Sequence, residues 1–134
     1  MRIVIVGCGR IGAHLARSLA AEGCDVCVVD QDEGSLRRLG AHFPGRTVAG
    51  TGFDEAVLAE AGVDRADAVA VLTNVDATNF MVARAVTQLF GVDRVTVRVN
   101  DQEFSPIFAA MGLRTIDVPE LVLSQVRGLL PGPG

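Results

Sequence analysis

Short apolar runs alternate along this chain with longer segments whose apolar residues recur at helical spacing. The runs are rich in Val and Ile and lack polar alternation, a pattern typical of strands that are buried on both faces. The predicted strands are residues 2–6, 26–29, 47–49, 68–72, 94–99 and 115–118. The predicted helices are residues 11–21, 32–41, 54–61, 76–90, 105–111 and 119–127. Asp54 and Ser105 are predicted N-caps, and Gly62, Gly91 and Gly112 are predicted helix stops.

This order of elements predicts the class of fold. Repeated strand–helix units with nearly all-apolar strands imply a parallel sheet that is covered by helices on both faces. Six strands suit the order 3-2-1-4-5-6, so we predict a doubly wound, Rossmann-type α/β fold. The 134 residues are enough for one domain, predicted at residues 1–130, and residues 131–134 are predicted to form a linker or ragged tail.

The turn between the first predicted strand and the first predicted helix matches the pattern G-x-G-x-x-G. It consists of Gly7, Cys8, Gly9, Arg10, Ile11 and Gly12. In this pattern Gly7 makes the tight turn, Gly9 lets a diphosphate approach the backbone, and Gly12 lets the helix pack closely on the strand. The N-terminus of the helix then offers free N–H groups and a partial positive charge to phosphates. The alternative is a turn that is kept only for packing.

Asp30 supplies the context that this motif requires. It ends the second predicted strand, 18 residues after Gly12, where a carboxylate accepts hydrogen bonds from the hydroxyls of a ribose. A 2'-phosphate would meet the negative charge of Asp30, so NADP is disfavoured. We therefore predict that Asp30, with the adjacent Gln31, binds an adenine nucleotide: NAD(H), ATP, ADP or AMP.

Further candidates follow the third and fourth predicted strands, because ligands of open α/β sheets bind at the carboxyl ends of the strands. Gly50, Thr51 and Gly52 are predicted to line the adenine, with a plain loop as the alternative. Thr73, Asn74 and Asn79 are of types that hydrogen-bond to phosphate or ribose. Here the alternative is that Thr73, Asn74 or Asp76 caps the next helix.

Two arginines are candidate phosphate ligands. Arg10 lies in the glycine turn, where its guanidinium can reach a terminal phosphate, or it is a solvated residue at the start of a helix. Arg98, inside the fifth predicted strand, points to phosphates or forms a structural ion pair with a neighbouring acid.

Composition excludes several classes of function. All twelve basic side chains are Arg and Tyr is absent, which rules out a P-loop Lys, a Schiff-base Lys and the Tyr–Lys pair of short-chain dehydrogenases. A net charge of -4 gives no electrostatic footprint for nucleic acid or an anionic membrane. No stretch approaches the roughly 18 to 20 apolar residues that span a bilayer, so we expect no direct membrane insertion and a cytoplasmic location.

The three cysteines, Cys8, Cys24 and Cys27, are predicted to be structural thiols, because an odd count argues against a disulfide framework. Cys24 and Cys27 match C-x-x-C, but they straddle the entry to a strand, where positions three apart face opposite sides. His14 and His42 lie far from them in the sequence, so no metal site is predicted. No group for proton transfer stands out, and we predict a binding module without catalytic residues rather than an enzyme.

Taken together, these motifs resemble the N-terminal regulator-of-potassium-conductance (RCK) domain, also called the TrkA-N domain. The resemblance covers nearly the whole chain. Its motifs are the glycine turn, residues 28–30, 48–54, 57–62, 66–68, 73–74, 76–79 and 98–100. It implies a cytosolic regulatory subunit of a Trk- or Ktr-type potassium uptake system, which binds NAD(H), ATP or ADP. The implied partners are a membrane-embedded potassium-translocating subunit and further copies of the chain, in a homodimer or larger ring whose rearrangement controls transport.

Carried across residue by residue, the resemblance gives Asp30 the ribose, the glycine turn the phosphates and Arg10 the terminal phosphate of ATP. Thr51 departs from the acidic or amide residue that many members have near the adenine, which leaves the choice among nucleotides open. Many members also carry a C-terminal domain after the last helix. Here the chain stops at Gly134, so we expect either a truncated chain or a subunit that works as a single domain.

The last two predicted helices bear on assembly. Phe104, Ile107, Phe108 and Met111 form an apolar stripe, for which we favour core packing at Phe108 and Met111. More apolar residues follow in the final helix: Leu121, Val122, Leu123 and Val126. Family members dimerise through this region, with the final helix crossing to the partner.

Two other functions stay open at this point. One is a small NAD-dependent oxidoreductase, or a fragment of one, which would need a substrate pocket with a proton-transfer group beside the nicotinamide. The other is a gating-ring domain of a potassium channel, cut from a longer chain, which a membrane-spanning segment in the parent protein would favour.

Overall fold

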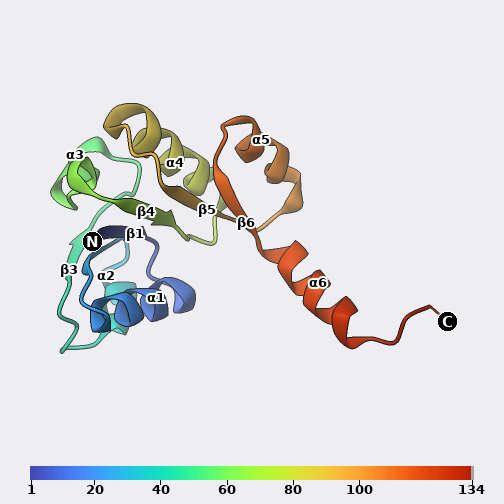
Figure 1. Cartoon of the computed structure of the whole chain (residues 1–134). Coiled ribbons are helices and arrows are strands. Elements are labelled where there is room, and N and C mark those ends of the chain that lie inside the picture. The colour runs from blue at the N-terminus through green and yellow to red at the C-terminus, as the bar shows by residue number, and fades with distance from the viewer. Residues whose placement is uncertain (134) are drawn as a thin grey trace.

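The apolar runs form the strands of one sheet, as their lack of polar alternation predicts. In the computed structural model, which describes residues 1–133, these strands make up a single six-stranded parallel sheet (Figure 1). The strands are β1 (Arg2–Val6), β2 (Asp25–Asp30), β3 (Arg46–Ala49), β4 (Ala68–Val71), β5 (Val95–Val99) and β6 (Arg114–Asp117). Their order is β3-β2-β1-β4-β5-β6, which confirms the predicted Rossmann-type topology.

Helices connect the strands and cover both faces of the sheet (Figure 1). The α-helices are α1 (Arg10–Ala21), α2 (Glu33–Leu36), α3 (Glu55–Glu60), α4 (Asp76–Phe90), α5 (Ser105–Ala110) and α6 (Val118–Leu129). Three short 3-10 turns are η1 (Arg37–Leu39), η2 (Val63–Arg65) and η3 (Gln102–Phe104).

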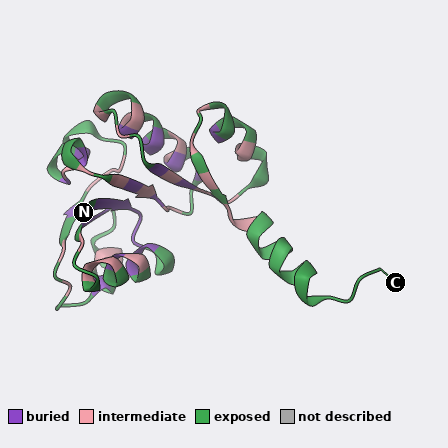
Figure 2. Cartoon of the chain, viewed as in Figure 1, coloured by how far each residue is buried: buried purple, intermediate pink, exposed green. Residues whose placement is uncertain are grey.

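The two faces of the sheet bury two separate clusters, because successive strand residues point to opposite sides. On one face, Ile3 and Ile5 of β1 pack with Ala13 and Ala16 of α1. On the other, Val4 and Val6 belong to a larger cluster that includes residues of α4 and Phe108 of α5. Figure 2 shows the buried residues along the strands and on the parts of the helices that face them.

The predicted cysteine arrangement fits the two clusters. Cys27 is buried in the larger cluster, whereas Cys8 is buried in the smaller one and Cys24 is half-buried against it. The residues of the C-x-x-C match therefore face opposite sides of the sheet, and all three thiols are free. Phe108 is in the core as expected, but Met111 is only half-buried.

Most predicted helix ends are confirmed. Asp54 caps α3 by accepting a 2.9 Å hydrogen bond from the N–H of Ala56. Gly62, Gly91 and Gly112 have positive φ angles of 86°, 64° and 72°, which only glycine adopts easily.

Two predicted helices differ from the structure. The helix predicted at residues 32–41 is α2 followed by η1, because Gly40, at φ +88°, ends the segment early. Ser105 is not an N-cap, since η3 precedes α5 and leads directly into it. The Ser105 hydroxyl instead donates a 2.7 Å hydrogen bond to the carboxylate of Asp117, the N-cap of α6.

Helix α6 leaves the body of the domain (Figure 1). Every residue from Glu120 to Leu130 is exposed, including large apolar side chains such as Leu121, Leu123 and Val126 (Figure 2). Of the predicted tail at residues 131–134, Gly134 lies outside the described residues. Among residues 1–133, no helix combines the length and apolar character needed to cross a bilayer.

Candidate functional site

The glycine turn after β1 is shaped by close approaches between backbone segments. Gly7 has φ +110°, and a Cβ there would lie 2.9 Å from the backbone of Leu72 and Thr73 at the end of β4. A Cβ on Gly12 would lie 2.0 Å from the carbonyl oxygen of Gly7, so only glycine lets α1 pack this closely on the turn. At Gly9 an added Cβ would meet nothing within 4 Å, because this residue faces open space.

Helix α1 begins directly after this open position. Its N-cap is Gly9, which has no side chain to satisfy the first N–H groups, and no acidic residue lies in the first turn. The N–H groups of the first turn and the helix dipole are therefore available to an anion that approaches over Gly9.

Asp30, at the carboxyl end of β2, is bonded to the glycine turn. Its Oδ2 atom accepts a 2.8 Å hydrogen bond from the N–H of Cys8, and its Oδ1 atom accepts one of 2.9 Å from the N–H of Asp32. Each oxygen keeps a further lone pair for a ligand hydroxyl. The carboxylate thus fixes the turn while it remains on the surface of the site.

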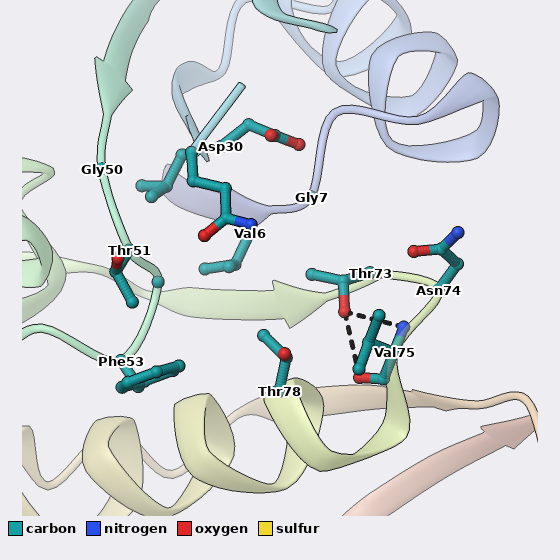
Figure 3. A pocket seen from close by; sticks show the side chains of 13 residues that line it. Val6, Gly7, Asp30, Gly50, Thr51, Phe53, Thr73, Asn74, Val75 and Thr78 are labelled. Carbon is teal, nitrogen blue, oxygen red and sulfur yellow. Dashed lines mark hydrogen bonds between the residues drawn. The ribbon is translucent and has the colours of Figure 1, made fainter. Parts of the chain in front are cut away.

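A groove follows the carboxyl edge of the sheet and consists of two adjoining cavities, of about 140 and 570 Å³. They share Gly7, Asp30, Thr73 and Asn74, so they form one continuous surface, which we call the carboxyl-edge groove. The smaller cavity extends under the loop after β3, as Figure 3 shows. The larger one lies over the glycine turn and the start of α1.

The structure brings most of the residues predicted for the site together at this edge of the sheet. All of the predicted site residues line the carboxyl-edge groove except Gly12 and Asn79. Gly12 packs under the turn, as described above. The structure corrects the role predicted for Asn79, whose side chain is fully buried.

Asn79 holds the end of β4 instead of facing the groove. Its Oδ1 atom accepts hydrogen bonds from the N–H and the hydroxyl of Thr73. Its Nδ2 atom donates to the carbonyl oxygens of Thr73 and Arg98, both at 2.9 Å. All of its hydrogen-bonding capacity is used, so Asn79 positions Thr73 and ties β4 to β5.

Asp76, in the first turn of α4, makes a second connection between these strands. Its carboxylate accepts hydrogen bonds of 2.8 and 2.9 Å from the N–H groups of Asn100 and Asp101. The alternative that Thr73, Asn74 or Asp76 caps α4 is therefore wrong. The N-cap of this helix is Val75, whose side chain makes no capping hydrogen bond. Thr73 makes a local turn, in which its hydroxyl oxygen accepts from the N–H of Val75 at 3.3 Å (Figure 3).

Positive charge is concentrated in the larger cavity. Arg10, Arg38 and Arg98 line it, and none of them forms an ion pair with the described residues. The ion pair considered for Arg98 is therefore absent from residues 1–133. Its Nε atom is buried there without a hydrogen-bond partner, which costs free energy unless an acceptor is supplied. Asp30 is the one acidic residue among those that line the larger cavity.

Several residues that line the groove were not predicted from the sequence. Ser35 and Arg38 line the larger cavity, and Arg38 is exposed there. Phe53, Val75 and Thr78 line the smaller cavity, across from or beside the predicted residues (Figure 3). One available signal was their position, because each lies within a few residues of a strand end or helix start at the same edge of the sheet.

The two buried cysteines, Cys8 and Cys27, add no reactive group. Burial raises the pKa of the Cys8 thiol, with the nearby charge of Asp30 acting in the same direction. Burial also raises the pKa of Cys27. Both thiols are therefore protonated and poorly nucleophilic at neutral pH. Within residues 1–133, no group of His, Cys, Asp and Glu residues is arranged to hold a metal ion.

Comparison with known proteins identifies a family and several relatives of this chain. Residues 3–119 match the TrkA-N domain family. The Trk system potassium uptake protein TrkA of Streptomyces coelicolor is 41% identical over 132 residues, which cover 98% of this chain and 59% of that protein. The protein of the same name from Halomonas elongata is 35% identical over 140 residues, covering 100% of this chain and 31% of that protein. The chain thus spans between 31% and 59% of the length of these relatives.

Solved structures share the fold. The TrkA-N domain of the inner membrane protein ybaL from Escherichia coli has a TM-score of 0.84 at 16% identity and covers 97% of this chain and 96% of its own. The Kef C-terminal domain of Shewanella denitrificans in AMP-bound form has a TM-score of 0.76 at 15% identity, with 96% and 80% covered. The GsuK RCK domain reaches 28% identity, with a TM-score of 0.72 over 87% of this chain and 24% of its own.

Proposed function

The chain belongs to the TrkA-N domain family, and we propose that it is a nucleotide-sensing regulatory domain of a potassium uptake system. One observation carries this proposal: the glycine turn, the Asp30 carboxylate and three unpaired arginines meet in one groove at the carboxyl edge of the sheet. The transported ion is inferred from relatives that are named Trk system potassium uptake proteins.

The proposed ligand is an adenine nucleotide, NAD(H), ATP, ADP or AMP. Asp30 accepts hydrogen bonds from the ribose hydroxyls, and the diphosphate lies over Gly9 at the N-terminus of α1. Arg10 and the unsatisfied Nε of Arg98 supply charge-assisted donors to phosphate oxygens. Structures of the same fold are named as a GsuK channel bound to NAD and as a Kef domain bound to AMP, which supports a nucleotide in general. The carboxylate of Asp30 disfavours the 2'-phosphate of NADP.

The proposed partners are a second copy of the chain and a membrane-embedded potassium-translocating subunit. Helix α6 presents Leu121, Val122, Leu123 and Val126 to solvent, between 47% and 56% exposed. Val122 and Leu123 lie four and three residues before Val126 on one side of the helix, and an exposed apolar face of this kind is stabilised by burial against a partner. A second copy that receives α6 would form a homodimer, from which a larger ring is built, peripheral to the cytoplasmic face of the membrane.

Regulation then follows from differential binding. A nucleotide that binds one arrangement of the dimer more tightly than another shifts the population toward that arrangement, and the transporter subunit responds to it. The size of this shift is limited by the difference between the two affinities.

The rival function is a small NAD-dependent oxidoreductase. Hydride transfer usually requires a proton donor or acceptor beside the nicotinamide. The described residues that line the groove include no His, Asp30 is their only acid, and the pKa of their one thiol, Cys8, is raised by burial. A binding domain therefore fits the groove better than an enzyme.

A third function is supported by a specific likeness. The GsuK RCK domain is 28% identical to this chain, so a gating-ring domain of a potassium channel is a second candidate. A membrane-spanning segment in the same parent protein would favour the channel, and a separate transporter subunit would favour the uptake system.

Calorimetric titration with ATP, ADP, AMP, NAD+, NADH and NADPH tests the proposal. We expect saturable binding of at least one adenine nucleotide, weaker binding of NADPH than of NADH, and no oxidation of NADH with any acceptor tried. Failure of every nucleotide to bind at millimolar concentration would overturn the sensor function. Catalytic turnover of NADH would favour the oxidoreductase.

A further inference from the structure

The two cavities of the carboxyl-edge groove differ in chemistry. The larger one offers N–H groups, Arg10 and Arg98, which suit phosphates. The smaller one has apolar walls and hydroxyl groups, with Val6, Val29 and Phe53 among its lining residues. Of the parts of a nucleotide, the base is flat and largely apolar on its faces, so it fits the smaller cavity while the sugar and phosphates occupy the larger one.

Phe53 is conspicuous in the smaller cavity because it is large, apolar and 43% exposed. It lies on the loop after β3, together with Thr51, on the side of the cavity opposite Thr73 and Asn74 (Figure 3). Thr78 of α4 lies between the two sides. An aromatic ring left half-exposed at the wall of a cavity has a free face to offer to a ligand.

The loop that carries Phe53 has little room to move. A Cβ on Gly50 would lie 2.6 Å from Cγ2 of Val57, and one on Gly52 would lie 2.6 Å from Cγ1 of Val6. The loop backbone therefore lies directly on core side chains at both glycines. This close packing fixes the loop and holds Phe53 at the cavity wall without burying it.

We propose that Phe53 is the residue that stacks on the nucleotide base, and that the smaller cavity selects a purine by its face rather than adenine by its edge. The inference rests on the proposed nucleotide-sensing function and deepens it. Stacking on an aromatic side chain contributes about 1–3 kcal/mol per base and tolerates different bases, because every base has a π-face.

The polar residues around the base explain why the smaller cavity should accept either adenine or guanine. Adenine presents an amino donor where guanine presents a carbonyl acceptor. The side chains of Gln31, Thr51, Asn74 and Thr78 each carry both a donor and an acceptor. The Thr73 hydroxyl is already engaged, since it donates to Asn79 and accepts from the N–H of Val75. Asp30 accepts only, and the lone pairs that its backbone hydrogen bonds leave free are those proposed to take the ribose hydroxyls. No side chain that lines this cavity is therefore fixed to match one purine edge and reject the other.

Titration of the full chain with ADP and with GDP tests the inference. We expect dissociation constants that agree within about tenfold for the wild type. Phe53→Ala should weaken both ligands by the same factor, about 5- to 150-fold, and Phe53→Leu should also weaken both because it lacks a ring face. Met81→Ala is the matched control, since Met81 is an exposed apolar residue of α4, 46% exposed, outside both cavities; it should leave both affinities unchanged.

A spectroscopic measurement checks the contact directly and does not depend on removing the ring. The chain has no Trp and no Tyr, so Phe53→Trp introduces a single indole. Stacking predicts that saturating ADP and GDP both quench its fluorescence, whereas Met81→Trp shows no change. An unquenched indole at position 53 at saturating ADP would contradict the stacking contact.

The outcomes separate this inference from the function on which it rests. If the wild type binds neither ADP nor GDP, the inference fails, and if it binds no other adenine nucleotide either, the proposed function fails with it. If the wild type binds ADP but Phe53→Ala binds it equally well, the inference alone is overturned. The same holds if Met81→Ala loses as much affinity for ADP as Phe53→Ala does. A preference for ADP over GDP of more than tenfold would also overturn it.

Discussion

The Oδ2 atom of Asp30 accepts a 2.8 Å hydrogen bond from the backbone N–H of Cys8, which lies 22 positions earlier in the chain. This bond joins the end of β2 to the middle of the glycine turn after β1. The carboxylate proposed to hold the ribose therefore also fixes the loop that is proposed to hold the phosphates. Ribose recognition and loop geometry are coupled through one side chain.

The first prediction concerns this coupling. Asp30→Ala removes the acceptor of both backbone hydrogen bonds as well as the ribose contact, so it should lose adenine-nucleotide binding at least 100-fold. It should also lower the free energy of unfolding by about 2 kcal/mol, because a hydrogen bond to a charged group contributes about 1.5–3 kcal/mol. Calorimetry and urea denaturation measure the two effects.

Asp25→Ala serves as the control, since Asp25 lies at the other end of β2 and forms an exposed ion pair with Arg2 at 3.3 Å. Exposed pairs contribute at most about 1 kcal/mol, so this variant should bind nucleotide like the wild type. Unchanged affinity in Asp30→Ala would contradict the role given to Asp30.

The second prediction concerns Asp76, which is 8% exposed and accepts hydrogen bonds from the N–H groups of Asn100 and Asp101. Asp76→Ala leaves two part-buried N–H donors without a partner, so the free energy of unfolding should fall by about 1–3 kcal/mol. Asp93→Ala removes an exposed carboxylate and should change stability by less than about 0.5 kcal/mol. Urea denaturation measures both effects. Equal stability of the two variants would contradict the role given to the Asp76 carboxylate.

The third prediction uses the raised pKa values of Cys8 and Cys27. Below their ordinary value of 9.0 the thiols are protonated in both states, and stability is unaffected. Above it, the unfolded chain ionises these thiols while the folded chain keeps them protonated, which favours unfolding. The free energy of unfolding should therefore fall between about pH 9 and pH 10.5, by up to about 1.4 kcal/mol per thiol and pH unit.

The composition makes this measurement clear, because the chain has no Lys and no Tyr to titrate in the same range. Urea denaturation across this pH range gives the slope. In the double variant Cys8→Ala, Cys27→Ala the slope should flatten markedly. A wild-type stability that stays constant up to pH 10.5, or an equally steep slope in the double variant, would exclude the linkage.

The fourth prediction concerns α6. If a second copy covers its exposed apolar face, Leu123→Asp or Val126→Asp should convert a dimer into a monomer, since each buries a charge in the interface. The monomer should keep its circular dichroism spectrum, because neither residue packs against the sheet. Analytical ultracentrifugation decides the question, and a wild-type chain that is monomeric at 100 µM would argue against the proposed assembly.

The fold was largely predictable because it depends on local patterns. All-apolar runs define the parallel strands, and Gly62 and Gly91 end the helices where the sequence indicates. One difference follows from a tertiary contact, because Ser105 bonds to Asp117 twelve residues away instead of capping its own helix. The other is local, because the segment of α2 and η1 ends at Gly40.

The site was predictable where one motif contains it, as in the glycine turn and Asp30. Asn79 is of a residue type that often contacts ligands, but here it is buried between α4 and β5. Its Nδ2 atom donates a hydrogen bond to the carbonyl oxygen of Arg98, and this packing cannot be read from the local sequence. Arg38 and Phe53 were missed for the same reason. Their place in the groove depends on loops from different strands meeting at one edge, which no local pattern encodes.

The central claim is that a diphosphate lies over Gly9, and the two glycines of the turn provide the sharpest test of it. A Cβ at Gly9 meets nothing within 4 Å, and the residue has φ -78°, so Gly9→Ala should fold with a stability close to that of the wild type. The added methyl group would nevertheless stand where the phosphates approach. Gly12→Ala is the contrasting variant, because its Cβ would lie 2.0 Å from the Gly7 carbonyl oxygen and should destabilise the fold itself.

Calorimetric titration of Gly9→Ala with ADP beside the wild type is therefore the measurement to make. The account predicts that the variant is folded, with an unchanged urea midpoint, and that its affinity for ADP is at least tenfold weaker. A folded Gly9→Ala that binds ADP as tightly as the wild type would contradict the claim, because the diphosphate would then lie elsewhere.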